Sequence, residues 1–296
     1  MLTIAISSRT LFDLNDAHKV FQTEGVEAYL AYQLAREDVP LEPGVAFPLV
    51  KKLSEIRHPE TKEHLVEVVL LSRNSGDVGL RIFNSIEHHG LKIERAAFSH
   101  GESPYNYLSA FGVQLFLSAH SHDVLNAIEA GHAAAHLMTR KASVAADGPV
   151  RLAFDGDAVL FSDESEQIYQ KSGLAVFRQN ELDKHNIPLT PGPFKSFLKQ
   201  LHDIQSLFPT NESPIRTALV TARSAPSHKR VILTLREWGI RIDEALFLGG
   251  QDKSAFLTSF KADIFFEDQL SYVKTASEHT ATGHVPYGVT NQNKNK

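Results

Sequence analysis

The most restrictive feature of this sequence is that it is repeated within the chain. The segment PLEPG near position 40 returns as PLTPG near position 188, an offset of 148 residues, and an offset of 149 aligns the segments that follow. Glycines and prolines match as well as apolar residues. Because these residues fix turns rather than cores, a tandem duplication explains the match better than chance similarity between two α/β segments. Matching pairs include Pro40 with Pro188, Gly44 with Gly192, Gly90 with Gly239, Gly101 with Gly250, and Phe116 with Phe265.

The repeat predicts two related halves, 1–145 and 146–296, joined near 141–149, where small and polar residues cluster. The last residues, NQNKNK, are expected to form a solvated tail. Each half has one strand, a long helical excursion, and then strand, helix, strand, helix, strand, an order typical of a doubly wound parallel α/β sheet. The strands predicted for the second half are Arg151–Phe154, Ala218–Val220, Ala245–Leu248 and Asp263–Phe266.

The composition excludes several classes of protein. A net charge of -5 argues against binding to nucleic acid polymers, which requires a concentrated basic face. No segment is long and apolar enough to predict a membrane span. The chain has no cysteine, which excludes disulfides and thiolate metal ligands, and its first residues lack the pattern of a signal peptide, so we expect a cytoplasmic protein. The oligomeric state stays open between a monomer and a homo-oligomer.

Polar residues follow each predicted strand of the second half. In open parallel sheets, ligands bind at the carboxyl ends of the strands, so these residues are expected to lie together. They comprise two carboxylates around a glycine, a hydroxyl residue, an amine and a second acidic pair, namely Asp155, Gly156, Asp157, Thr221, Lys253, Glu267 and Asp268.

This set fits phosphoryl transfer through an aspartyl-phosphate. Asp155 is the predicted nucleophile, and Asp157 is the predicted general acid and then general base. Gly156 allows the backbone to turn closely around the phosphoryl group. Glu267 and Asp268, with Asp155 and the main-chain carbonyl of Asp157, provide hard oxygen ligands that suit Mg²⁺.

The other strand ends are predicted to hold the phosphoryl group. Thr221, with the neighbouring Ala222, is expected to bind a phosphoryl oxygen, and Lys253 to stabilise negative charge in the transition state.

Four segments, FDGDAV, LVTAR, GGQDKSAFL and DIFFEDQ, resemble in order the four signatures of the haloacid dehalogenase (HAD) superfamily. Over almost the full chain, ISSRTLFDL, SRNSGDVGLRIFNSIEHHGL, FDGDAVLFSDESE and GHVPYGV are similar to the cytosolic 5'-nucleotidase type I family. The resemblance implies a HAD-like Rossmannoid fold, Mg²⁺ dependence and hydrolysis of nucleoside 5'-monophosphates such as AMP. The chain has FFEDQ where the family has two aspartates, which leaves open whether Glu267 or Asp268 binds the metal directly.

The first half lacks these chemical groups. At the positions equivalent to the two acids of the nucleophile segment it has Ser7 and Arg9, and opposite Thr221 it has Ser72. Opposite the lysine and the second acidic pair it has Pro104, Ser118 and Ala119. We therefore expect one active site per chain and a first half that acts as a scaffold, a wall of the nucleoside pocket or an effector site.

The segment between the first two strands of the second half is too long for an ordinary loop, so it predicts a cap over the site at about 164–211. Within it, Phe177, Arg178 and Asn180 are candidates to contact a nucleoside, although a core phenylalanine with solvated neighbours is the more common role for such a pattern. The histidines at helical spacing, His132 and His136, are interpreted as packing or surface residues, because no third metal ligand accompanies them.

Three functions remain to be separated. The favoured one is a 5'-nucleotidase. A phosphatase acting on a sugar or cofactor phosphate would use the same strand-end residues, because these bind only the phosphoryl group. The third is a nucleotide-binding module without catalysis.

Overall fold

The computed structural model describes residues 1–139 and 148–292, and the chain divides into two compact units. The first unit comprises Met1–Ala127 and His136–Ala145, and the second comprises Ile128–Ala135 and Ala146–Lys296. Most of the predicted junction at 141–149 lies outside the described residues, as do the last four residues of the predicted tail.

The beginning of that tail is not solvated as expected. It forms the end of helix α11 (Val289–Gln292), and the Asn291 side-chain amide donates a hydrogen bond to the main-chain carbonyl of Asp268 at 3.1 Å. The prediction was wrong at this point because an amide side chain has satisfied a buried carbonyl, which sequence polarity alone does not indicate.

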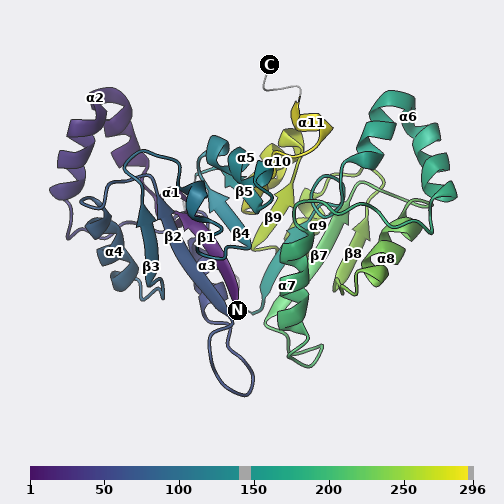
Figure 1. Cartoon of the computed structure of the whole chain (residues 1–296), viewed down its shortest axis with the longest axis horizontal. Coiled ribbons are helices and arrows are strands. Elements are labelled where there is room, and N and C mark those ends of the chain that lie inside the picture. The colour runs from purple at the N-terminus through teal and green to yellow at the C-terminus, as the bar shows by residue number, and fades with distance from the viewer. Residues whose placement is uncertain (140–147, 293–296) are drawn as a thin grey trace. The chain divides into compact units, whose positions relative to one another are not determined.

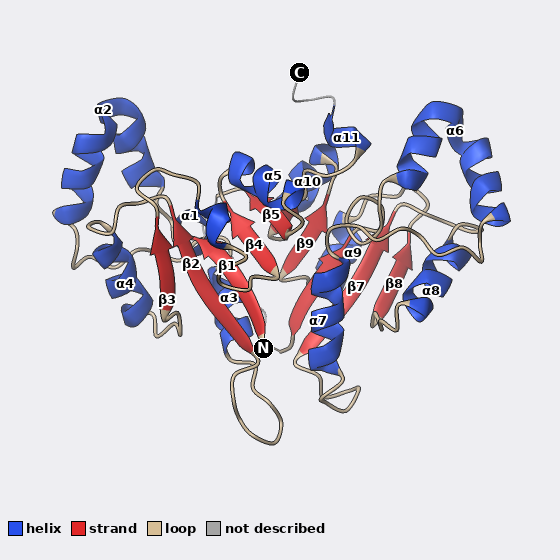
Figure 2. Cartoon of the chain, in the orientation of Figure 1, coloured by secondary structure: helices blue, strands red, loops and turns tan. Residues whose placement is uncertain are grey.

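The first unit is a parallel α/β sheet with the strand order β3-β2-β1-β4. Helices flank its strands (Figure 2). Its elements are β1 (Leu2–Ser7), α1 (Ser8–Leu11), α2 (Asn15–Leu34), α3 (Phe47–Ser54), β2 (Val66–Ser72), α4 (Gly79–His88), β3 (Arg95–Phe98), η1 (Pro104–Tyr107) and β4 (Leu115–Ser118), while α5 (Ser121–Glu129) and β5 (Ala133–Leu137) cross the division between the units.

The second unit repeats this order of elements, and its strands run parallel in the order β10-β9-β6-β7-β8. The four predicted strands correspond to β6 to β9 within three residues at each end, and the short strand β10 was not predicted. The elements are β6 (Val150–Phe154), α6 (Glu164–Asp183), α7 (Lys195–Gln205), β7 (Ile215–Thr221), α8 (His228–Glu237), β8 (Glu244–Phe247), α9 (Ser254–Phe260), β9 (Ile264–Glu267), α10 (Leu270–Ser277) and β10 (Thr282–His284).

Aromatic packing fixes the ends of the two central strands of the second unit. Phe154 and Phe266 are register partners on β6 and β9, and their rings stack with centroids 5.3 Å apart. Phe194 and Phe197 pack on the same pair, and all four rings are fully buried. Such a core resists displacement because a buried aromatic ring removes a large apolar area from water. The residues that follow Phe154 and Phe266 are therefore held side by side.

Each unit contains one long helix that bends at a glycine, α2 at Gly25 and α6 at Gly173. The φ angles are 88° and 78°, which glycine adopts without the steric penalty of a side chain. The two glycines are related by the same offset of 148 that aligns PLEPG with PLTPG. In Figure 1, each bent helix stands beyond the arrowheads of the strands of its own unit.

The predicted cap segment, 164–211, contains two different structures. Helix α7 buries Phe197, Leu198 and Leu201 completely and contacts β7, so it belongs to the helical layer on the sheet. Helix α6 exposes most of its residues. Only α6 and its flanking turns therefore have the position of a cap. No helix within residues 1–139 or 148–292 is long and apolar enough to cross a bilayer.

Candidate active site

The nucleophile candidate lies in the loop that leaves β6. Asp155 is 6% exposed, and its main-chain N–H donates to the carbonyl of Phe266 on the adjacent strand at 2.9 Å. A Cβ atom on Gly156 would lie 3.3 Å from the Thr221 hydroxyl oxygen. Glycine thus leaves room between the β6 loop and the end of β7, where a small anion can approach the backbone.

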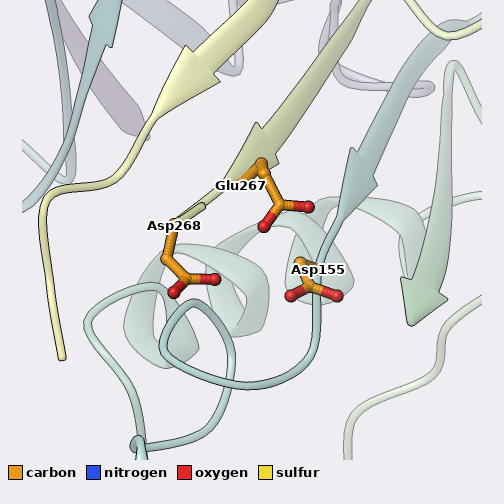
Figure 3. A group of neighbouring side chains, drawn as sticks. All are labelled: Asp155, Glu267 and Asp268. Carbon is orange, nitrogen blue, oxygen red and sulfur yellow. The ribbon is translucent and has the colours of Figure 1, made fainter. Parts of the chain in front are cut away.

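Three buried carboxylates meet at the ends of β6 and β9. Oxygen atoms of Asp155, Glu267 and Asp268 lie within 4.8 Å of one another. Figure 3 shows the three side chains gathered at the strand ends, with Glu267 at the end of β9 and Asp268 directly after it. The strand register explains this meeting, because Phe154 pairs with Phe266 and the next residues on each strand become neighbours.

This carboxylate cluster favours a bound cation. Burial, opposed by the Lys253 ammonium and reinforced by the Glu267 carboxylate, raises the pKa of Asp155 to about 7. Burial and the carboxylates of Glu267 and Asp155 raise the pKa of Asp268 well above its usual range. Removing water from like charges is unfavourable unless a counter-charge is present. The donor set therefore fits a hard divalent cation.

Lys253 provides one counter-charge in the same place. Its Nζ lies 2.8 Å from Asp155 Oδ1 and 2.6 Å from Glu267 Oε2, and its side chain is 3% exposed. Burial opposes the charge on this amine, but Asp155 and Glu267 raise the pKa of Lys253, so the ammonium form is favoured. The loop that carries it turns through Gly249 and Gly250, both with positive φ, and Lys253 caps α9.

Asp157 is held by an arginine that the sequence analysis did not select. Arg223 Nε donates to Asp157 Oδ2 at 2.8 Å, and its Nη2 donates to Oδ1 at 2.6 Å. This bidentate contact fixes the orientation of the carboxyl group. Thr221 accepts a hydrogen bond from the Arg223 main-chain N–H at 3.2 Å, and Ala222 lies between them. Arg223 was visible in the motif LVTAR, but a single arginine in a loop usually indicates a solvated residue.

A second acid, also missed, lies behind Arg223. Glu181 on α6 is 1% exposed and accepts hydrogen bonds from Arg223 at 2.6 Å and from Arg230 of α8 at 3.0 Å. Burial opposes the charge on Arg223, yet Asp157 and Glu181 raise its pKa. A signal for this group was present, because Arg230 matches Arg81 under the 149-residue offset.

The candidate nucleoside residues lie on α6 beyond its bend. The guanidinium of Arg223 is 5.5 Å from the centroid of the Phe177 ring, which places this ring beside the site. Asn180 is half-buried and its amide lies 3.5 Å from Glu181 Oε1. Arg178 is exposed.

The histidines are not gathered into a metal site among the described residues. His136 Nε2 lies 3.2 Å from the carbonyl of Ala119, which is a packing role. His132 and His136 are also not one turn apart on a helix as expected, because β5 contains His136 and starts after His132.

The fold and the site together define an α/β protein with a carboxylate and ammonium cluster at the ends of parallel strands. The profile of the 5'-nucleotidase family matches residues 1–292, and the chain belongs to this family. Human cytosolic 5'-nucleotidase 1B is 43% identical over 287 residues, which cover 93% of this chain and 47% of the human protein. The chain thus spans about half the length of that relative. No solved structure matches it significantly.

Proposed function

We propose that this chain is a 5'-nucleotidase that hydrolyses nucleoside 5'-monophosphates, AMP among them, to nucleoside and phosphate. The observation that carries the proposal is the Asp155–Lys253–Glu267 cluster, with Asp268 beside it, in a member of the 5'-nucleotidase family. We assign the second unit to the HAD-like Rossmannoid class, the first unit to a degenerate copy of it, and the protein to the cytoplasm.

In the first step an oxygen of Asp155 attacks phosphorus, and the bond between phosphorus and the 5'-oxygen breaks. The proton that the departing oxygen needs comes from Asp157, which gives the nucleoside and an aspartyl-phosphate. In the second step water attacks phosphorus, Asp157 takes a proton from that water, and the bond to Asp155 breaks. Inorganic phosphate leaves and both carboxyl groups return to their starting state.

Arg223 orients Asp157 for both proton transfers. Both oxygens of Asp157 accept hydrogen bonds from Arg223, at 2.8 and 2.6 Å, which hold the carboxyl group in one orientation. We propose that the phosphoryl group of the substrate draws Arg223 away from one oxygen. Asp157 then carries on that oxygen the proton that it gives to the leaving group, and it regains a proton from the attacking water in the second step. Lys253 and Thr221 contact the phosphoryl oxygens, with Gly156 and Ala222 contributing main-chain N–H groups.

Mg²⁺ is the proposed cofactor, and bound there it would neutralise charge between the nucleophile and the phosphoryl group. Asp155 and Asp268, with the main-chain carbonyl of Asp157, are its proposed direct ligands. Glu267 is a weaker candidate, because Oε2 bonds Lys253 at 2.6 Å and Oε1 accepts the Gln269 N–H at 3.0 Å. We assign Glu267 to orienting the lysine.

Specificity is assigned to α6. We propose that Phe177, whose ring lies beside Arg223, stacks on the base, and that Arg178 and Asn180, one and three residues further along the chain, form polar contacts to the nucleoside. We propose that these residues distinguish a nucleoside from a sugar in the leaving group.

The test is phosphate release from AMP, IMP, CMP and glucose 6-phosphate, with Mg²⁺ and with EDTA. We expect a preference for nucleotides, loss of activity in EDTA, and a fall of at least about 10⁴-fold in kcat for Asp155→Asn. Asp16→Asn, the same exchange at an exposed position of the first unit, is the matched control and should leave kcat unchanged. Asp268→Asn should raise the Mg²⁺ requirement more than Glu267→Gln.

Two outcomes would reject the proposal. Activity that survives Asp155→Asn would remove the aspartyl-phosphate route, and failure of the unmodified protein to release phosphate from any compound would leave a nucleotide-binding module. A preference for glucose 6-phosphate would keep the chemistry and reject the substrate class.

A further inference from the structure

The first unit contains a cavity of about 510 Å³ at the carboxyl ends of its strands. This volume is in the range of pockets that bind small organic ligands. Its floor is formed by residues that end or follow β1, β2 and β4, including Ser7, Ser8 and Ser118. Residues of the bent helix α2 form one wall. The cavity therefore lies where parallel sheets bind ligands, in the unit without the catalytic acids.

Arg9 is the cation of this cavity that has no acidic partner among the described residues. Its Nε is buried without a hydrogen-bond partner, and its terminal amine has only a long contact of 3.4 Å with His18 Nε2. Burial lowers the pKa of Arg9, and a guanidinium remains charged even so. A half-buried guanidinium with an unused donor fits an anionic ligand.

The other charges that line the cavity compensate each other. Arg73 Nε donates to Asp123 Oδ2 at 3.0 Å, and Asp123 is the one acid among the described lining residues. Burial lowers the pKa of His120 to about 4, and burial together with the nearby Arg9 charge lowers the pKa of His18, so a positive charge is disfavoured on both rings. The positive charge of Arg9 is thus left for a ligand to neutralise.

Hydroxyl groups stand where the second unit has its phosphoryl site. Ser8 and Ser72, equivalent to Gly156 and Thr221, have hydroxyl oxygens 3.0 Å apart. Ser7 replaces the nucleophile, and its hydroxyl accepts the Ala119 N–H at 3.1 Å. Hydroxyls and a guanidinium can bind a phosphate without a metal ion.

The α2 side of the cavity is largely apolar and aromatic. Phe21, Val26, Tyr29 and Leu30 of α2 line it. The Phe21 and Tyr29 rings meet edge to face with centroids 6.0 Å apart, and the Tyr29 hydroxyl donates to Asn74 Oδ1 at 2.8 Å. Aromatic rings beside an unpaired guanidinium favour a ligand that has a ring and a charged group.

We propose that this cavity binds a phosphate monoester with a planar ring, such as a nucleoside monophosphate, without metal and without hydrolysing it. Arg9 and the hydroxyls of Ser7 and Ser8, which line the cavity, bind the phosphate, and α2 packs on the ring. Among the described lining residues the one carboxylate is Asp123, which is paired with Arg73, and the equivalent of the proposed nucleophile is Ser7, so we expect no hydrolysis in this cavity.

The experiment is calorimetric titration of the full chain with AMP, adenosine or inorganic phosphate in EDTA. AMP should bind more tightly than either fragment. Arg9→Gln should weaken AMP binding about tenfold or more, since a charged hydrogen bond is lost. Arg57→Gln, an exposed arginine of the same unit, is the matched control and should bind AMP as the unmodified chain does. Lys253→Gln should also retain this binding, which separates the cavity from the catalytic cluster.

A second measurement protects the test from a folding defect in Arg9→Gln. Phenylglyoxal modification of Arg9, quantified by peptide mass spectrometry in the unmodified chain, should slow when AMP is present. Absence of AMP binding in EDTA, equal binding of adenosine and AMP, or AMP binding lost in Lys253→Gln and retained in Arg9→Gln would each overturn the proposal.

Discussion

The two units use the same path of buried polar side chains for different purposes. In the second unit the path consists of four ionisable side chains, each bonded to the next: Arg230, Glu181, Arg223 and Asp157. It ends at a residue of the candidate active site. Each charge has an opposite neighbour, as buried ions require.

In the first unit the equivalent path is mostly neutral. Arg81 donates to Gln33 at 2.7 Å, Gln33 to the Tyr29 hydroxyl at 3.0 Å, and Tyr29 to Asn74 at 2.8 Å. The arginine is retained and the acid and second arginine are not.

The retained arginine has a structural role in both units. Arg81 Nε donates to the carbonyl of Val39 at 3.0 Å, and Arg230 Nε to that of Ile187 at 2.8 Å, so each arginine secures the loop after its bent helix. The comparison separates an arginine contact that both units keep, and that supports the fold, from the contacts of Glu181 and Arg223, which only the second unit has and which we propose serve catalysis.

After Asp155→Asn, the largest effect should come from Lys253→Gln, because the first unit has Pro104 at the equivalent position and no such amine. We expect kcat to fall about 10²- to 10³-fold, because a preorganised charge against the transition state is lost. Steady-state phosphate release measures this. Lys261→Gln, an exposed lysine at the other end of α9, is the control, and a similar loss there would contradict a specific role for Lys253.

Glu181 and its equivalent Gln33 lie at the centre of the two paths, and substituting each by the other residue type tests how much the charge stabilises the second unit. Glu181→Gln should lower the free energy of unfolding by about 3 kcal/mol, because Arg223 and Arg230 lose their shared counter-charge. Gln33→Glu should change the free energy of unfolding by less than about 1 kcal/mol. The new carboxylate gains a charged partner in Arg81, but the burial that lowers the pKa of Arg81 also disfavours a charge at this place, so the two effects offset each other. Urea unfolding of both variants measures the difference. Equal losses would mean that the charge of the second path is not what stabilises it.

The smallest effect concerns His120 of the first unit, which faces Asp123, Arg73, Arg9 and His18. Burial lowers its pKa to about 4, below the usual 6.5, so the unfolded chain binds the proton more readily and stability is lost as pH falls from about 6.5 to about 4. His120→Gln should remove up to about 2 kcal/mol of that loss. Urea unfolding at pH 7.5 and 5.0 compares the variant with the unmodified chain, and parallel losses would contradict the assignment.

The sequence predicted the four strands β6 to β9 of the second unit to within three residues at each end, and the reason is physical. Apolar runs such as those before Asp155 and Glu267 identify buried parallel strands, and parallel register then brings their ends together. The duplication presents each element twice, so the glycines and prolines of one half confirm the turns expected in the other.

The residues that were missed are long-range partners. Glu181 lies on a mostly polar helix, where a carboxylate usually faces water, and only the fold brings Arg223 and Arg230 to it. Helix α7 was placed in the cap because segment length does not distinguish an excursion from a helix that covers the sheet. The short strand β10 and helix α11 gave no periodic signal of useful length.

The repeated PLEPG and PLTPG segments, which follow the bent helices, fix the chain at the carboxyl end of each helix. A Cβ on Gly192 would clash with the carbonyl oxygen of Phe161, and one on Gly44 would come within 2.8 Å of that of Thr10. The Gly192 N–H also donates to the Leu160 carbonyl at 2.8 Å. The PLTPG segment thus lies directly against the turn that follows β6, and no residue larger than glycine fits at position 192.

This anchoring lets the far end of α6 change independently of the loop that carries Asp155. Because the chain after α6 is held against the loop that follows β6, we expect substitutions near the Gly173 bend to change the far end of α6 without moving the proposed reacting groups. If α6 contacts the leaving group as proposed, relatives that act on different leaving groups should differ there first.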